Sequence, residues 1–186
     1  GPEQSGFLMS VGYDLYLKLL EEAVLEEKGE APAKRRECTA DLSVAASIPD
    51  RYVPSPEQRM DLYRRIARIR TEEDADDMTD ELIDRFGDPP RSVNDLISVA
   101  LLRGRAADCA ISDISQKGMS IRFTLDGFDL EHISRAAALF PGRVLFSPGD
   151  KAVLTLKLKK GEDPLRMASK LVEEYQKVLG AGPEAT

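Results

Sequence analysis

The period of the hydrophobic residues changes near residue 110, and this change constrains the fold more than any other feature of the chain. Before it, apolar residues recur every three or four positions, which is typical of amphipathic helices. After it, apolar and polar residues alternate, which indicates half-buried strands. The clearest alternation places on one side Met119, Ile121, Phe123 and Leu125. The sequence therefore predicts an α+β fold.

Amphipathic helices are expected before the change at about residues 56–70, 73–86 and 90–109. Ser55 can cap the first of them, with Pro56 at its first position. Gly87 and the two prolines that follow end the second helix, whose inward side chains are Met78, Leu82, Ile83 and Phe86. Ahead of these helices, alternation over residues 38–48 predicts one strand, with inward side chains Leu42, Val44, Ala46 and Ile48.

The residues after the change predict the order β-β-α-β-β-α. Strands are expected at about residues 111–114, 119–125, 144–146 and 154–158, with turns at residues 116–118 and 147–150. Short turns favour hairpins and antiparallel pairing. Asp129 and Asp163 can cap the two helices, and the first helix has as its inward side chains Leu130, Ile133, Ala137 and Phe140. We expect helices packed on a small, mostly antiparallel sheet.

Composition divides the chain into four segments. Residues 1–28 are expected to form a separate N-terminal helical segment, because apolar residues recur at helical spacing over residues 11–28. Residues 29–37 are rich in charge and contain Gly and Pro, which indicates a linker. Residues 38–180 are expected to form the main domain, and the small polar residues 181–186 a disordered tail.

The charge and cysteine content exclude several classes of protein. A net charge of −7 argues against a domain that binds bulk nucleic acid. Cys38 and Cys109 lack metal-site spacing and are expected to be reduced core thiols in a cytoplasmic protein. No apolar run is long enough to span a membrane, and no secretory signal is present.

No motif predicts catalysis, a metal or a bound cofactor in this chain. The phosphate-binding loop pattern is absent. The single histidine, His132, has no nucleophile motif beside it and is best explained as a surface or half-buried helix residue. Two basic clusters are candidate nucleic-acid contacts, although no aromatic residues are interleaved with them. Their residues are Lys34, Arg35 and Arg36, and Lys157, Lys159 and Lys160.

The helix at residues 73–86 carries more acid than its own stability favours. Like charges lie four residues apart in two rows, Glu73–Asp77–Glu81 and Asp76–Asp80–Asp84, and each such contact costs a few tenths of a kcal/mol. Only Arg85 offers a nearby opposite charge, as the i+4 partner of Glu81. Solubility explains such a face. The alternative is that the face docks on a basic surface of another domain.

Two separated stretches resemble the bacterial transcription-repair coupling factor (Mfd) family. "EQSGFLMSVGYDLYLKLLEEAV" is similar to the end of that family's helicase motor. "DLSVAASIPDRYVPSPEQRMDLYRRIARIRTEED", followed by "ELIDRFGDPP", is similar to the start of its C-terminal domain. The two stretches occur in the family's order, so the resemblance implies the tail of a motor joined to a C-terminal regulatory domain.

The resemblance also implies a role. In the family, the full-length protein is an ATP-driven translocase on double-stranded DNA that displaces stalled RNA polymerase and recruits UvrA. Its C-terminal domain docks on an N-terminal UvrB-like module, which masks UvrA binding and restrains the motor. The implied contact residues here are Glu81, Asp84 and Arg85. ATP and magnesium would belong to the motor, and not to this chain. The alternative is a DNA-binding accessory domain of the translocase.

Overall fold

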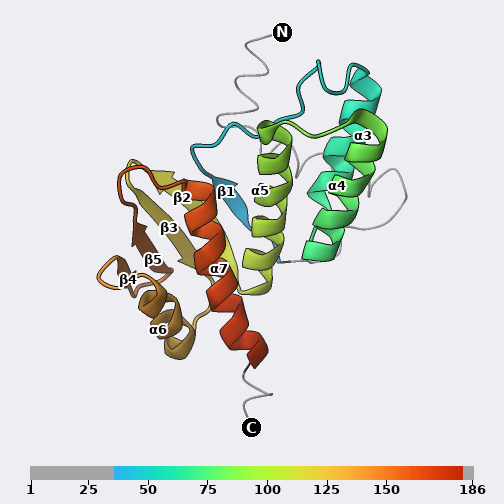
Figure 1. Cartoon of the computed structure of the whole chain (residues 1–186). Coiled ribbons are helices and arrows are strands. Elements are labelled where there is room, and N and C mark those ends of the chain that lie inside the picture. The colour runs from blue at the N-terminus through green and yellow to red at the C-terminus, as the bar shows by residue number, and fades with distance from the viewer. Residues whose placement is uncertain (1–35, 182–186) are drawn as a thin grey trace. The chain divides into compact units, whose positions relative to one another are not determined.

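The computed structural model describes residues 36–181, and it confirms the α+β class. Within that range the chain forms five helices and five strands (Figure 1). The expected N-terminal helical segment, most of the expected linker and residues 182–186 lie outside the described residues.

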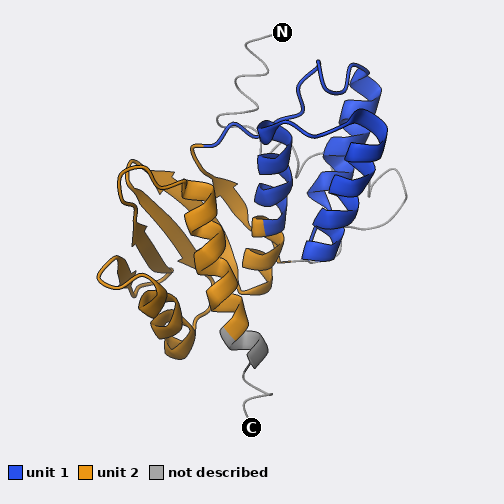
Figure 2. Cartoon of the chain, viewed as in Figure 1, with its two compact units in different colours: residues 1–35, 44–101 blue, residues 36–43, 102–186 orange. Residues whose placement is uncertain are grey.

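The described residues divide into two compact units (Figure 2). Unit 1 contains residues 44–101. Unit 2 contains residues 36–43 together with those from residue 102 onward. Helix α5 (Arg91–Asp108) contributes its first part to unit 1 and its last part to unit 2.

Unit 1 is built from helices. These are α3 (Pro56–Ala67), α4 (Glu72–Phe86) and the first part of α5. The Ser55 side chain caps α3 by accepting a hydrogen bond from the Gln58 amide, as the sequence predicts for this position. α3 ends earlier than predicted, because the chain turns after Arg68 and Thr71 caps the start of α4. The core of this unit includes Val53, Leu62, Ile66, Leu82, Val93 and Leu96.

Unit 2 contains one five-stranded sheet. Its strands are β1 (Thr39–Asp41), β2 (Ile111–Lys117), β3 (Ser120–Leu125), β4 (Val144–Ser147) and β5 (Ala152–Lys157). The spatial order is β1-β2-β3-β5-β4. β1 pairs with β2 in parallel and every other pair is antiparallel, so the mostly antiparallel sheet is confirmed.

Two complete helices accompany the sheet in unit 2, besides the last part of α5. They are α6 (Leu130–Leu139) and α7 (Pro164–Ala181), and they lie side by side. Figure 1 shows α7 in front of the sheet. Asp129 caps α6 through the Glu131 amide, and Asp163 accepts a hydrogen bond from the Leu165 amide at the start of α7. The apolar residues that α7 buries include Leu165, Met167, Ala168, Leu171, Val172 and Tyr175.

The predicted strand over residues 38–48 is wrong in extent, because only Thr39–Asp41 is a strand. The burial still alternates, since Leu42, Ala46 and Ile48 are buried. The chain passes from unit 2 to unit 1 after Ser43. Beyond that point the Ser47 amide bonds to the Ser92 carbonyl of unit 1 rather than to a strand.

In unit 2, two residues predicted to face inward are exposed. Met119 is 53% exposed because it lies with Gly118 in the turn between β2 and β3, where Lys117 pairs with Ser120. Leu130 is 62% exposed at the first position of α6. The buried residues of that helix are Ile133, as predicted, and Ala136.

Candidate functional site on helices α3 and α4

A capping box begins helix α4. The Thr71 hydroxyl accepts a hydrogen bond from the Asp74 amide, and the Asp74 carboxylate accepts from the Thr71 amide. The Arg70 amide also donates to Asp74, and these backbone hydrogen bonds, Arg70 first, lower the pKa of the Asp74 carboxyl. This box was not among the features predicted from the sequence, although a threonine followed three residues later by an acid is a readable signal.

One apolar stripe holds α4 against the rest of unit 1. Its buried side chains are Ala75, Met78 and Leu82. Phe86 continues the stripe and is half-buried. Ile83, which the sequence placed beside this stripe, is 42% exposed, so that expectation is wrong. Because the stripe fixes how the helix is rotated, the opposite side of α4 faces solvent.

The C-terminal end of α4 is fixed by Gly87 and Tyr52. Gly87 has φ 82° and ψ −171°, a conformation that is essentially restricted to glycine. The Tyr52 hydroxyl donates to the Gly87 carbonyl at 2.7 Å, and its ring centroid lies 5.8 Å from that of Phe86. The guanidinium of Arg85 lies 4.9 Å from the centroid of the Phe86 ring. These contacts position Arg85 at the edge of the exposed face.

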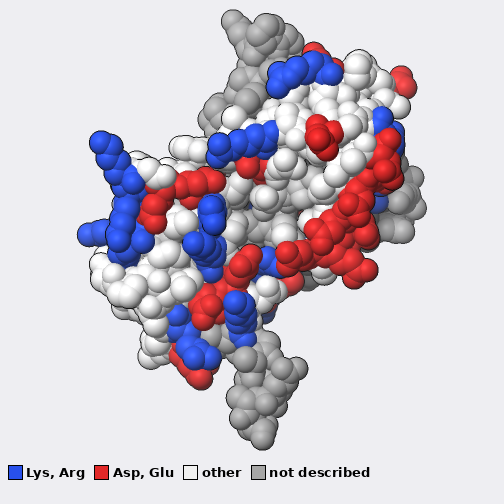
Figure 3. Space-filling view, viewed as in Figure 1, with Lys and Arg blue, Asp and Glu red and all other residues white. Residues whose placement is uncertain are grey.

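The exposed side of α4 is a row of carboxylates. Figure 3 shows a red band over the position of this helix. Within the described residues, five exposed acids have side chains without a hydrogen bond or ion pair: Glu73, Asp76, Asp77, Asp80 and Asp84. We call these five residues the acidic face. Their mutual repulsion disfavours the isolated helix and would be relieved by a basic surface.

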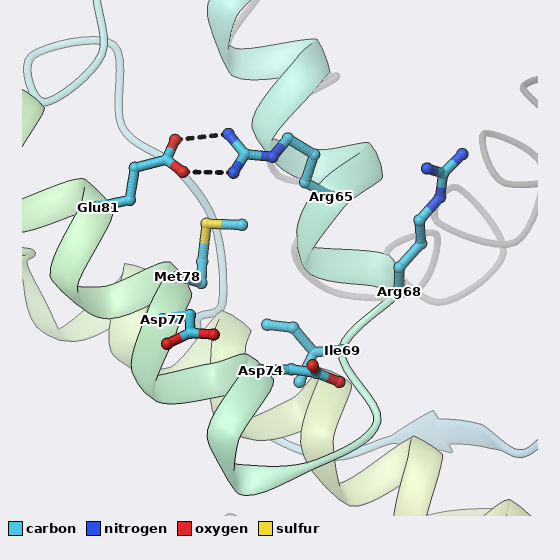
Figure 4. Close-up of a pocket in the computed structure, with 7 residues that line it drawn as sticks. All are labelled: Arg65, Arg68, Ile69, Asp74, Asp77, Met78 and Glu81. Carbon is cyan, nitrogen blue, oxygen red and sulfur yellow. Dashed lines mark hydrogen bonds and ion pairs between the residues drawn. The ribbon is translucent and has the colours of Figure 1, made fainter.

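Glu81 is the exception, because two arginines of unit 1 bind its carboxylate. Arg65 of α3 donates to both carboxylate oxygens through its two terminal nitrogens (Figure 4). Arg85 donates to Oε2 at 2.8 Å, as the i+4 spacing predicted. The hydrogen bond from Arg65, followed by that from Arg85, lowers the pKa of Glu81 to about 2 against the desolvation that raises it. The Glu81 side chain is therefore a carboxylate that Arg65 and Arg85 keep ionised and fixed in position.

Arg65 is the residue of this site that our sequence analysis did not identify. It lies 16 residues before Glu81, on a different helix. The hydrogen bond to Glu81 is the largest cause of a raised Arg65 pKa. Helical spacing reports only neighbours on one helix, and therefore no local signal could have found this pair.

The three residues implied by the family resemblance differ in how accessible their charges are. Asp84 is exposed and belongs to the acidic face. The side chains of Glu81 and Arg85 are 34% and 37% exposed, and they pair with each other. Together with Arg65, the Glu81 and Arg85 side chains form a group of one acid and two bases. The surplus negative charge therefore resides on the acidic face and not on Glu81.

A surface pocket of about 330 Å³ lies beside the Arg65–Glu81 pair. Figure 4 shows Ile69 and Met78 between the two helices, and Arg68 pointing away from Glu81. The acids that line the pocket are Asp74, Asp77 and Glu81, and the bases are Arg65 and Arg68. The Asp74 carboxylate accepts hydrogen bonds in the capping box, and the Glu81 carboxylate accepts them from the two arginines. The Asp77 carboxylate accepts none within the described residues.

The other candidate residues show no reactive arrangement. His132 is half-buried on α6 with its ring 5.4 Å from that of Tyr175, as expected for a structural histidine. Cys38 and Cys109 are buried free thiols, and burial raises the pKa of Cys109 to about 11. Residues 36–181 contain no group of three or more His, Cys, Asp or Glu side chains able to hold a metal ion. Within the same range, no helix has the length and hydropathy needed to cross a membrane.

The candidate basic clusters are only partly described. Lys157, Lys159 and Lys160 are exposed around the end of β5. The backbone amide of Lys159 donates to Glu162, whose carboxylate also pairs with Arg143. Arg36 is exposed, while Lys34 and Arg35 lie outside the described residues. The DNA-binding alternative stays a prediction.

Residues 42–134 match the family model of the TRCF domain, which covers half of the chain. The chain belongs to the TRCF domain family. The TRCF relative from Bacillus subtilis (strain 168), a transcription-repair-coupling factor, is 34% identical over 152 residues, 81% of this chain and 12% of the relative. The transcription-repair-coupling factor of Staphylococcus aureus (strain USA300) is 31% identical over 188 residues, 96% of this chain and 16% of the relative. The chain therefore spans well under a fifth of the length of these relatives.

A solved structure supports the TRCF fold. It is the crystal structure of the C-terminal domain of a transcription-repair coupling factor, and it matches with a TM-score of 0.70. The match covers 79% of this chain and 98% of that chain at 18% identity, which bears on the fold alone. The contact roles of Glu81, Asp84 and Arg85 in this TRCF chain remain predictions.

Proposed function

We propose that this chain is the C-terminal part of a longer transcription-repair coupling factor and acts there as an autoinhibitory interaction domain. It docks on the N-terminal UvrB-like module of the same protein, masks UvrA binding and restrains the DNA translocase. We call this longer protein the parent protein. Membership of the TRCF family supports its identity as a transcription-repair coupling factor. The observation that carries the docking role is the acidic face of α4, five exposed carboxylates without partners in the described structure.

The acidic face suits a contact that must close and open. An exposed ion pair contributes about 0.2–1 kcal/mol, so a few of them give a modest interface. The linker expected at residues 29–37 would make docking intramolecular, and a tether raises the effective concentration to the millimolar range. A weak contact can then hold the closed state and still yield when another partner competes.

Asp84 is the centre of this proposal. It is exposed, belongs to the acidic face and is one of the three residues implied by the resemblance. A guanidinium on the partner would bind its carboxylate by charge-assisted hydrogen bonds. Arg85, fixed over Phe86, borders this contact and would offer a cation to an acid on the partner.

The proposed role for this chain is regulatory, with no catalysis of its own. ATP hydrolysis, DNA translocation, RNA polymerase displacement and UvrA recruitment would belong to the cytoplasmic parent protein. The chain contains no phosphate-binding loop of the G-x-x-x-x-G-K-[ST] type. Its contribution would be to change the balance between closed and open states of the parent, which requires different contacts in the two states.

Asp84→Lys in the parent protein should raise UvrA affinity and DNA-stimulated ATP hydrolysis by about five-fold or more, since coupling energies between sites are typically 1–3 kcal/mol. The substitution should leave the fold intact, because the side chain is exposed and unpaired in the described structure. Asp150→Lys makes the same charge change at an exposed turn position and is the matched control. UvrA titration and ATPase assays measure both effects. Equal UvrA affinity for wild type and Asp84→Lys would contradict the proposal.

A further inference from the structure

The Glu81 carboxylate has little capacity left for a partner. A carboxylate offers about four acceptor positions on its two oxygens. Arg65 uses one on each oxygen, and Arg85 uses a second on Oε2. A partner arginine binds a carboxylate best with two parallel hydrogen bonds, which Glu81 cannot accept while Arg65 remains in place.

The pocket beside the pair provides another acceptor for Arg65. Asp77 lies one helical turn before Glu81 on α4 and lines the same pocket as Arg65 (Figure 4). Residues four apart on a helix have Cβ atoms about 5–6 Å apart, and an arginine side chain has the length and freedom to cover such a shift. The Asp77 carboxylate has no hydrogen bond or ion pair within the described residues.

The other acids near Arg65 are less suited to receive it. Asp74 is held by the Arg70 and Thr71 amides at the start of α4. Asp61 lies one turn before Arg65 on α3 and raises the Arg65 pKa only as the last of its causes, and it does not line the pocket. Asp77 is the acid that combines a place in the pocket with an unused carboxylate.

We infer that Arg65 is an internal competitor for Glu81, and that it moves to Asp77 when an arginine of the docking partner binds Glu81. This inference rests on the proposed docking function and adds Arg65 and Asp77 to the residues that set its affinity. The Arg65–Glu81 pair must break before the partner arginine can bind Glu81. The free energy of that pair is therefore subtracted from the free energy of docking. The availability of Asp77 recovers part of that loss, so Asp77 should favour the docked state.

Arg65→Gln should tighten the binding of this chain to the N-terminal module of the parent protein by about five-fold, the equivalent of one favourable exposed ion pair. Arg68→Gln is the matched control. It makes the same charge change on the same pocket, one turn away, without touching Glu81, and it should change affinity by less than about two-fold. Isothermal titration calorimetry measures both. Equal effects of the two substitutions would overturn the inference, since they would reflect net charge alone.

Arg65→Lys provides a second variant in case the glutamine variant is poorly folded. Lysine keeps the charge but cannot make the paired hydrogen bonds, so binding should tighten by a smaller factor than with glutamine. Thermal unfolding verifies that each variant is folded before binding is measured. Arg65→Lys binding no more tightly than wild type would count against the competition.

A double-mutant cycle tests the role of Asp77. Asp77→Asn should weaken docking by about two- to five-fold in the wild-type background and have no effect in the Arg65→Gln background. Asp61→Asn should have little effect in either. An equal loss in both backgrounds would show that Asp77 contacts the partner directly, and would overturn the exchange. Wild type failing to bind the module at all would instead overturn the proposed function on which the inference rests.

Discussion

Glu81 and Asp84 lie less than one helical turn apart on α4, yet their carboxylates are in different states. Arg65 and Arg85 hold Glu81, while Asp84 is exposed and without a partner in the described structure. The i+4 pair with Arg85 could be predicted because both residues are on one helix. The pair with Arg65 could not, because it depends on how α3 packs against α4. Glu81 therefore contributes to the fold, and Asp84 is the cleaner probe of docking.

Glu81→Gln should lower the free energy of unfolding by about 1 kcal/mol at pH 7, the range expected for partly exposed ion pairs. The folded-state pKa of Glu81 is about 2, below its ordinary value of 4.5. Its contribution is therefore complete above about pH 4.5 and is lost as the pH falls toward 2. Urea unfolding of both proteins at pH 7 and at pH 3 measures this.

Asp84→Asn is the control for that measurement, and it should change stability by less than about 0.5 kcal/mol because Asp84 is exposed. A Glu81→Gln deficit of equal size at both pH values would argue against the carboxylate as its source.

At the scale of elements, capping residues predicted the ends of helices more reliably than alternation predicted the extent of strands. Ser55, Gly87 and Asp129 mark the ends predicted for them, because capping depends on the local backbone alone. Alternation over residues 38–48 gave the correct side for Leu42, Ala46 and Ile48 but the wrong extent for the strand. A strand needs a hydrogen-bonded neighbour, and the sequence of one segment cannot show where its neighbours end.

Gly87→Ala should destabilise the protein by about 1–3 kcal/mol, because φ 82° with ψ −171° strains any residue that carries a Cβ. No atom lies within 4 Å of the added Cβ, so the loss would be due to the backbone and not to a clash. Gly127→Ala is the matched control, because that position is equally open and lacks a positive φ. Thermal unfolding compares the two. A loss at Gly127 as large as at Gly87 would remove the backbone explanation.

At the scale of the whole molecule, the class and order of the elements followed from the sequence. The β-β-α-β-β-α order after residue 110 and the mostly antiparallel sheet are both confirmed. Two compact units were not predicted, because periodicity describes each element alone. The site was only partly predictable: the surplus acid of α4 was visible in the sequence. The structure was needed to show how much of this negative charge is already neutralised within unit 1.

The most direct test of the docking proposal is the affinity of this chain for the N-terminal UvrB-like module of the parent protein, measured in trans by isothermal titration calorimetry. Wild type should bind, and Asp84→Lys should bind at least ten-fold more weakly, since it replaces an attraction by a repulsion on an exposed face. The exposed-turn control Asp150→Lys should bind as wild type does. Binding of equal strength by wild type and Asp84→Lys, or no binding by wild type, would contradict docking through α4.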